Sequence, residues 1–286
     1  MTMLKKTHHG DVTIFKAART FMGRPLYITH FFYVDGLLID TGPSHVSTEI
    51  IAALRELNLE KVVITHQHED HTGNCSLIQK EFGTPIFAHP DTIRVLANPP
   101  EIEIYRKIMW GDLPQATARP LDNFVTTDRY RLETIYTGGH SIDHVCYFEP
   151  QNRWLFAGDL YLGESLIGFM VGENIVEHLR SLQLLISLNP STLFCGLKGR
   201  LDNATERLTR KYNCWWDLCC KVQELHSAKA TRQQILANVF GGEILFYYFS
   251  QSNWGRGHML DSIIENSAYF DSCSKKESLA GPLHYR

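Results

Sequence analysis

Three histidines and an aspartate lie within six residues of one another, in the segment THQHEDH at residues 65–71. The run KVVIT directly before His66 is apolar and β-branched, so it predicts a buried strand with these side chains on the loop that follows it. Residues at i and i+2 of an extended segment share one side, which lets His66 and His68 bind one metal ion together. Asp70 and His71 then point elsewhere and suit a second metal position beside the first. Solvated loop histidines are the alternative interpretation, but so dense a set is costly without a ligand.

Two further candidate ligands follow other predicted strands. His140 lies in GGHS after the run RLETIYT, and Asp159 lies in AGDL after the run RWLFA. The two glycines before His140 allow close approach of the backbone to a ligand, and an aspartate can bridge two cations through its two oxygens. Because both residues sit where a strand ends and a loop begins, we expect them to complete the site.

Such a site predicts hydrolysis. A divalent cation lowers the pKa of bound water from about 15.7 toward about 7 and polarises a carbonyl or phosphoryl oxygen of the substrate. Asp70 is the predicted catalytic residue, because its carboxylate can orient the hydroxide and pass a proton to the leaving group. Zinc fits these ligands in one or two positions, and iron or manganese would fit as well, since histidine and carboxylate select weakly among these ions.

The elements that must position these residues indicate an α/β fold. From residue 12 to residue 195, short β-branched or aromatic runs alternate with amphipathic stretches, as is typical of strands interleaved with helices. Asp35-Gly36, between LYITHFFYV and LLID, predicts a hairpin. The other predicted strands are KVVIT, PIFAH, RLETIYT, VCYFE, RWLFA and STLFC, and helices are expected at residues 74–82 and 175–188.

The pattern changes after Gly199. Helical stretches follow at residues 203–226, 231–239 and about 256–269, while EILFYYFS between them is ambiguous. We therefore predict a metal-binding domain at residues 1–199 and a helical C-terminal appendage at 200–286, whose last dozen residues form a frayed tail. No flexible linker follows Gly199, so we expect the appendage to pack near the metal site. Residues 101–123 resemble an insertion that borders the site.

Composition excludes several classes of protein. The chain has 286 residues, 44% of them hydrophobic and 21% charged, with a net charge of −3, which disfavours disordered, membrane and general nucleic-acid-binding proteins. The N-terminal segment lacks the apolar region of a secretory signal, so we expect a cytoplasmic protein. Seven irregularly spaced cysteines predict reduced thiols in place of a disulfide framework.

These residues resemble the metallo-β-lactamase superfamily, whose motif HxHxDH is matched by residues 66–71. The resemblance spans about residues 12–199 and implies an αββα sandwich of two sheets flanked by helices. It implies that His66, His68 and His140 hold a first metal, that Asp70 and His71 belong to a second, and that Asp159 bridges them. It further implies that the aspartate of LLIDTG, Asp40, supports the metal loop from behind.

The resemblance fails at one position. Members of the superfamily carry a final histidine in a Gly-His-Gly turn, whereas this chain reads LFCGLKG, with Leu197 in that place and Lys198 beside it. Leucine cannot bind a metal and a lysine cation opposes one, so the second metal position should be weak or empty. Lys198 stays a candidate to contact the second position or the substrate. His144, four residues after His140, is expected to orient a ligand or donate a proton without binding metal itself.

The expected function follows from the site and the resemblance. We expect a metal-dependent hydrolase of a small-molecule ester or thioester, with a lactone as a further option. The helical appendage resembles small-molecule members such as the quinolone-signal thioesterase, and its aromatic residues suit an apolar acyl pocket. A degenerate metal-binding regulator with little turnover is the main alternative, motivated by Leu197, and a phosphodiesterase or nuclease is a third. Neither a nucleic acid nor a membrane is expected as a partner, and the sequence leaves the oligomeric state open.

Overall fold

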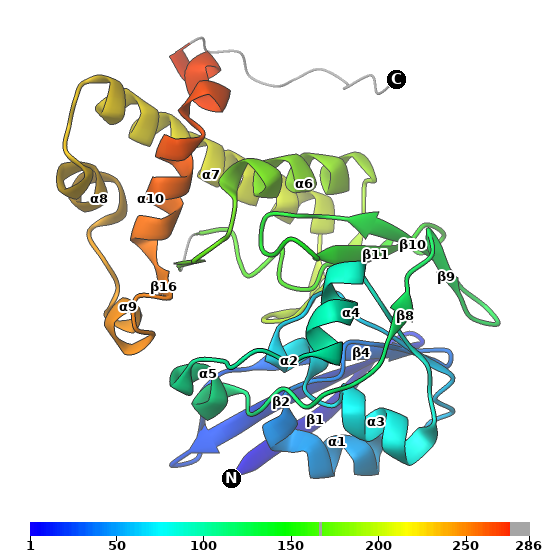
Figure 1. Cartoon of the computed structure of the whole chain (residues 1–286). Coiled ribbons are helices and arrows are strands. Elements are labelled where there is room, and N and C mark those ends of the chain that lie inside the picture. The colour runs from blue at the N-terminus through cyan, green and yellow to red at the C-terminus, as the bar shows by residue number, and fades with distance from the viewer. Residues whose placement is uncertain (166–167, 275–286) are drawn as a thin grey trace.

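Two β-sheets pack face to face at the centre of the molecule, and helices cover both outer faces (Figure 1). The computed structural model describes residues 1–165 and 168–274. The first sheet has the strand order β1-β2-β4-β5-β6-β7-β8, with β3 paired to β2, and the second has the order β15-β14-β12-β11-β10-β9. This arrangement confirms the predicted α/β sandwich with helices at its C-terminal end.

The elements have the following bounds. The first sheet contains β1 (Thr2–His9), β2 (Val12–Phe21), β3 (Arg24–Pro25), β4 (Thr29–Val34), β5 (Leu37–Ile39), β6 (Lys61–Val63), β7 (Ile86–Ala88) and β8 (Arg119–Pro120). The second contains β9 (Phe124–Thr126), β10 (Arg131–Tyr136), β11 (Val145–Glu149), β12 (Trp154–Phe156), β14 (Thr192–Cys195) and β15 (Gly199–Asp202), while β13 (Phe169–Met170) pairs with β16 (Trp254–Gly255). The helices are η1 (Ser44–Val46), α1 (Ser47–Leu54), α2 (Glu69–Thr72), α3 (Cys75–Phe82), α4 (Pro90–Ala97), α5 (Ile104–Met109), α6 (Ile175–Ser187), α7 (Ala204–Ser227), α8 (Arg232–Phe240), α9 (Leu245–Phe249), α10 (Arg256–Glu265) and η2 (Ser267–Ser274).

The alternation of side chains along the strands creates the layers. Phe31 of β4 packs in the core between the first sheet and its helices, whereas the next residue, Phe32, packs in the core between the two sheets. The Phe32 ring lies 5.6 Å from Phe156 and 5.4 Å from Phe194, both from the second sheet. Since both faces of each sheet are covered, the loops at the strand ends are held on a rigid frame.

The predicted strands and helices of residues 12–195 are present, including the hairpin at Asp35-Gly36, where both residues have positive φ. The N-terminal strand β1 was not predicted. It is an edge strand that pairs along its whole length with β2 but is mostly exposed or half-buried. A polar edge strand lacks the apolar alternation by which strands are recognised in a sequence.

Helices α6 and α7 pack on the second sheet, and α8 and α10 pack in turn on α7. The core between that sheet and these helices contains Leu179 of α6 together with Leu208 and Trp215 of α7. Figure 1 shows α6 and α7 lying together over the outer face of the sheet. The second sheet also continues past the predicted boundary at residue 199, because β15 pairs with β14. The ambiguous segment EILFYYFS forms the short helix α9. The predicted frayed tail, residues 275–286, lies outside the described residues.

The expectation that all cysteines are reduced is wrong for one pair. Cys220 of α7 forms a disulfide with Cys273 of η2, with 5.2 Å between their Cα atoms and 53 residues between them in sequence. Only the packing of η2 on α7 brings the two together, and spacing along the chain carries no sign of it. The other five cysteines are free, and four of them are buried.

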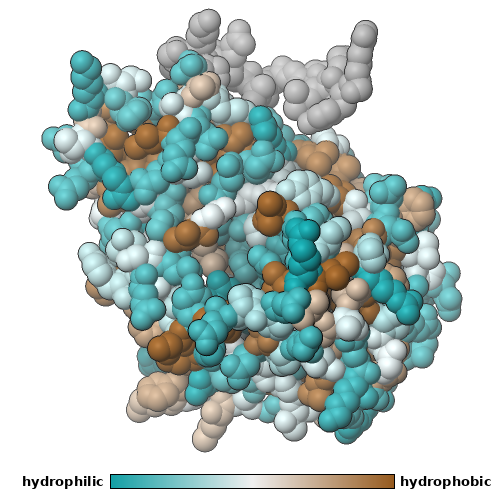
Figure 2. All heavy atoms as spheres, viewed as in Figure 1, coloured by the Kyte–Doolittle hydropathy of each residue, from teal (hydrophilic) through white to brown (hydrophobic). Residues whose placement is uncertain are grey.

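Among the described residues, no helix has the length and apolar character needed to cross a membrane. On the face shown in Figure 2, apolar side chains are interspersed with hydrophilic ones.

Candidate metal centre

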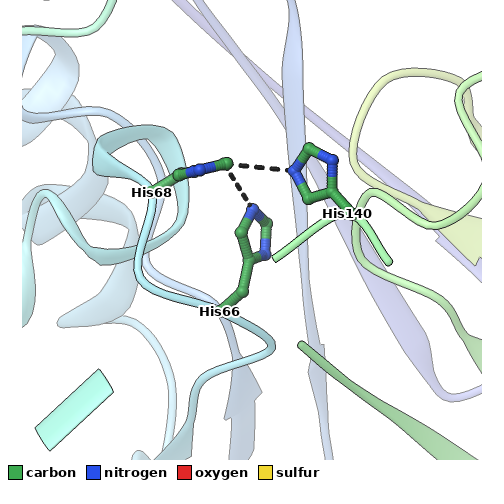
Figure 3. A group of neighbouring side chains, drawn as sticks. All are labelled: His66, His68 and His140. Atoms are coloured by element: carbon green, nitrogen blue, oxygen red, sulfur yellow. Dashed lines mark hydrogen bonds between the residues drawn. The ribbon is translucent and has the colours of Figure 1, made fainter. Parts of the chain in front are cut away.

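The three histidines expected to bind the first metal converge in space. His66 and His68 lie on the loop that connects β6 of the first sheet to α2. His140 lies on the loop after β10 of the second sheet. His68 Nδ1 is 2.9 Å from His66 Nε2 and 3.1 Å from His140 Nε2 (Figure 3). One nitrogen from each ring therefore faces the same small space, which suits a single metal ion.

The rings of His66 and His68 are held neutral. Burial lowers the pKa of both imidazoles well below the usual value, and positive charge nearby adds to the effect, from His71 at His66 and from Arg106 at His68. Neutral imidazole is the form that binds a metal, because its lone pair is free. Thr65 Oγ1 lies 3.0 Å from His66 Nδ1 and leaves Nε2 of that ring to the cluster.

A second cluster lies beside the first and consists of His71, Asp70 and Asp159. His71 Nε2 is 3.4 Å from Asp159 Oδ1 and 3.6 Å from Asp70 Oδ2. Burial alone would lower the pKa of His71, but the carboxylates of Asp70, Asp40 and Asp159 outweigh it and raise that pKa well above the usual value. In the metal-free chain, a proton on His71 thus supplies the positive charge that these carboxylates require.

The two aspartates of this cluster differ in basicity. Burial raises the pKa of the Asp70 carboxyl to about 6, against the opposing influence of His71. At Asp159 burial acts in the same direction, but His71 and His140 outweigh it and lower the pKa to about 2. In the metal-free chain Asp159 therefore stays ionised, while Asp70 can exchange a proton near neutral pH.

A second group that could hold a metal ion consists of His71, Asp159 and His66, whose ligand atoms all lie within 4.8 Å of one another, and Asp70 lies outside this group. His71 Nε2 is buried and has no hydrogen-bond partner among the described residues, while Nδ1 of the same ring donates to Asp40 Oδ2 at 2.7 Å. Asp40 also accepts hydrogen bonds from the backbone and the hydroxyl of Thr65, both at 2.8 Å. A carboxylate behind the ring fixes its orientation and leaves the other nitrogen for a cation, as in histidine–metal sites generally.

Both clusters open onto one cavity of about 230 Å³. His68, Asp70, His140 and Asp159 lie on its wall together with Arg106. The rest of the lining is apolar or aromatic and consists of Leu26, Tyr27, Tyr105, Met109, Trp110, Leu162, Met170, Phe246 and Trp254. The cavity therefore offers a concentrated polar corner in an otherwise apolar space, which is typical of small-molecule sites.

The predicted insertion and the appendage meet over this cavity. Tyr105 of α5 donates a hydrogen bond of 2.6 Å to Asn253 Oδ1, and Asn253 Nδ2 donates to Glu103 at 3.0 Å. The Tyr105 ring also lies edge-on to Phe246 of α9, 5.8 Å away. In Figure 1, α5 and α9 accordingly lie on the same side of the molecule.

Comparison with known proteins decides the family. The sequence model of the metallo-beta-lactamase superfamily matches residues 32–197, which is more than half of the chain. The chain is a member of the metallo-beta-lactamase superfamily. It is 31% identical to the beta-lactamase-like protein 2 homolog of Caenorhabditis elegans over 182 residues, which cover 60% of this chain and 55% of that protein. It is 27% identical to thioesterase pkgB of Emericella nidulans over 180 residues, which cover 61% of this chain and 46% of that one.

These matches span about half the length of the two curated relatives. A solved structure, of a metallo-beta-lactamase family protein from Thermus thermophilus, superposes with a TM-score of 0.69 at 16% identity and covers 91% of this chain and 95% of that one. At that identity the likeness establishes the fold alone. The coverage extends well beyond residues 32–197, so the fold of that protein is similar to this chain over much of the appendage too.

The turn that departs from the superfamily pattern lies against the second cluster. A Cβ atom placed on Gly196 would come within 2.2 Å of Asp159 Oδ1 and 3.0 Å of His71 Cε1. The half-buried Leu197 follows directly, so its position is adjacent to the cluster. Lys198, however, is exposed and lines a different cavity, together with Glu164 and Arg207. The structure therefore does not bring Lys198 onto the wall that His68 and Asp70 share.

His144 lies behind the superfamily ligands. Its Nε2 accepts a hydrogen bond of 3.2 Å from the backbone N–H of Asp159, so Nδ1 carries the proton and donates to Thr137 Oγ1 at 2.8 Å. Burial lowers the pKa of this imidazole well below the usual value, which keeps it neutral. The ring thus fixes the start of the loop that carries Asp159.

Sequence reasoning missed Glu173. This buried carboxylate accepts a hydrogen bond of 2.9 Å from His140 Nδ1, and its other oxygen lies 3.3 Å from His178 Nε2 of α6. It directs Nε2 of His140 toward His68 in the way that carboxylates behind metal-binding histidines do. The residue lies just before α6, far from HxHxDH in sequence, and no local pattern marks it.

Replacing Glu173 with glutamine should weaken metal binding at the three-histidine cluster by about ten- to hundredfold, because the amide can still accept a hydrogen bond but lacks the charge. Competition with a chelator of known affinity would measure the change. Glu177→Gln is the matched control, since it removes an exposed carboxylate of α6 that pairs with Arg180. Equal affinities in both variants would show that Glu173 does not orient His140.

Lys211 of α7 connects the appendage to the loop that carries Asp159. This lysine is 2% exposed, donates a hydrogen bond of 2.7 Å to the carbonyl of Leu160, and lies 4.2 Å above the Trp215 ring. Leu160 directly follows Asp159, so Lys211 fastens that loop to the helix. Burial lowers the pKa of the ammonium to about 8, despite the nearby carboxylates of Glu173 and Asp159.

The lowered pKa of Lys211 makes stability depend on pH. The unfolded chain binds a proton at this lysine up to its ordinary pKa of 10.5, whereas the folded chain releases it from about 8, so the folded state gains relative stability as pH rises between these values. We expect the free energy of unfolding of metal-free protein, relative to Lys211→Met, to increase by about 2 kcal/mol from pH 8 to pH 9.5. Denaturant titrations of both proteins at each pH would measure this change. If the difference in unfolding free energy between the two proteins stayed the same at both pH values, the lowered pKa of Lys211 would be contradicted.

Proposed function

We propose that the chain is a metal-dependent hydrolase of a small-molecule ester or thioester with an apolar acyl group. One observation carries the proposal: His68, Asp70, His140 and Asp159 form the polar corner of a 230 Å³ cavity whose other walls are apolar or aromatic. A bond placed at this corner has the ligand clusters on one side and apolar space for an acyl group on the other. The name of the relative from Emericella nidulans, a thioesterase, agrees with this chemistry.

A bound divalent cation would supply hydroxide at neutral pH and polarise the carbonyl oxygen of the substrate. His66, His68 and His140 would hold one such ion, and Asp70, His71 and Asp159 would hold another more weakly. Imidazole and carboxylate ligands suit zinc, while iron and manganese also accept them.

The protein's own groups would guide the proton and the acyl chain. Asp70 lies on the cavity wall beside the three histidines, so its carboxylate can accept a proton as the carbonyl is attacked and pass it to the departing thiol or alcohol. Thr29 donates a hydrogen bond of 3.1 Å to Asp70 Oδ2 and fixes its direction. The aromatic walls would desolvate the acyl group and hold its carbonyl at the polar corner.

A regulator with little turnover is the second candidate, and Leu197 is the observation that favours it. Such a regulator would keep the three-histidine cluster and the cavity but would lack a tightly bound second metal ion. In that case, metal and ligand would bind to the chain with no accompanying hydrolysis.

Purified protein of known metal content should be assayed against a panel of thioesters, esters, lactones and phosphodiesters. We expect turnover of thioesters and esters with aromatic or medium-length acyl groups and none of phosphodiesters. Ligand binding without turnover of any substrate would favour the regulator, and turnover confined to phosphodiesters would overturn the proposal.

A further inference from the structure

Arg106 contributes a guanidinium to the wall of the cavity. It comes from α5, in the insertion, and is 7% exposed. Its Nε and Nη2 both donate to Glu69 Oε2, at 3.0 and 2.7 Å, and Glu69 is the residue between His68 and Asp70. The guanidinium is thus fixed beside the metal loop, and the Trp110 ring lies 5.7 Å from it.

The hydrogen-bonding capacity of Arg106 is not exhausted by these contacts. A guanidinium has five N–H donors in a rigid planar fork. Glu69 takes two, and the Tyr105 hydroxyl beside the guanidinium accounts for at most one more. Nε and Nη2 are the nitrogens that donate to Glu69, which leaves Nη1 of this cavity-lining side chain to donate to a ligand or water.

The charge of Arg106 is already balanced, and this restricts what the free donors can bind. Glu69 lies 2.7 Å from Nη2 and Glu103 lies 3.9 Å from Nε. Asp70, on the same wall of the cavity, also raises the pKa of the guanidinium. A further carboxylate would meet three acidic neighbours in a buried space, whereas an uncharged oxygen could accept the hydrogen bonds without that repulsion.

We infer that Arg106 selects substrates whose apolar acyl group carries an uncharged oxygen acceptor, such as a ketone or an amide, away from the scissile bond. The inference rests on the proposed ester or thioester hydrolysis and makes it more specific. Arg106 acts here as a specificity residue that contacts the acyl group, while the aromatic walls hold the ring or chain that bears the oxygen.

Three thioesters test the inference: phenylacetyl, 4-acetylphenylacetyl and 4-carboxyphenylacetyl. We expect the kcat/KM of the acetyl compound to exceed that of the unsubstituted one about tenfold, as one hydrogen bond to a charged donor allows, and the carboxylate compound to be the poorest. Arg106→Lys keeps the charge opposite Glu69 but removes the fork, and should reduce the tenfold preference to about twofold. Arg232→Lys is the matched control, because it alters an exposed bidentate pair with Asp261.

Calorimetric dissociation constants of the three acid products, measured with metal-free protein, give a readout independent of turnover and should follow the same order. A preference for the acetyl compound that survives in Arg106→Lys, or a preference for the carboxylate compound, would overturn the inference. Absence of turnover with every thioester would refute the proposed function instead, and the product affinities would still decide the role of Arg106.

Discussion

Replacing His68 with alanine should remove most of the metal bound to the purified protein. His68 Nδ1 is the nitrogen that faces both His66 and His140, so its loss leaves two ligands that no longer converge on a third. A metal's stabilisation of the transition state amounts to several kcal/mol, so hydrolysis should fall on the order of a thousandfold. Elemental analysis gives the metal content, and circular dichroism verifies that the variant is folded.

His226→Ala provides the control for His68→Ala. His226 is an exposed histidine near the end of α7, so this change should leave metal content and rate unchanged. Full metal content in both His66→Ala and His68→Ala would place the metal elsewhere in the protein.

The second large effect should come from restoring the missing histidine. Position 197 is adjacent to Gly196, which lies directly against Asp159 and His71, so we expect an imidazole there to reach the second cluster. Adding a fourth ligand to Asp70, His71 and Asp159 by Leu197→His should tighten the second metal by about a hundredfold, which corresponds to about 2.8 kcal/mol. If two ions take part in hydrolysis, the rate at limiting metal concentration should rise as well.

Stepwise removal of metal by a chelator measures this difference. The unmodified protein should lose one ion well before the other, and Leu197→His should retain both. Leu201→His, which places a histidine on β15, is the control for adding an imidazole to the same region. Two equally tight ions in the unmodified protein would show that another residue completes the second position and would remove the main support for the regulator.

The parts of the site that lie close together in sequence were predictable. HxHxDH follows a short apolar strand, and the strand places these side chains at a sheet edge before any tertiary contact is considered. His140 and Asp159 were found because glycines and predicted strand ends mark them. Their convergence with residues 66–71 depends on how the two sheets pack face to face. The alternating pattern predicts that the sheets pack, but it does not give their relative position.

The parts that depend on distant contacts were not predictable. Glu173 reaches His140 because of the way the segment before α6 folds, and Arg106 reaches Glu69 because the insertion folds back over residues 66–71. Neither residue lies in a local motif. The closeness of Lys198 to Leu197 in sequence favours a place near the second cluster, yet the turn directs Lys198 to another cavity. The disulfide between Cys220 and Cys273 likewise depends on the docking of η2 on α7.

The most direct test of a hydrolytic metal site at His66, His68 and His140 is to remove all metal from the protein and measure thioester hydrolysis as zinc is added back. Hydrolysis should be absent from the stripped protein and return as the first equivalent binds, and His68→Ala should not recover at the same zinc concentrations. Hydrolysis that persists in the stripped protein, or that His68→Ala recovers equally well, would contradict the assignment of this cluster as the centre of activity.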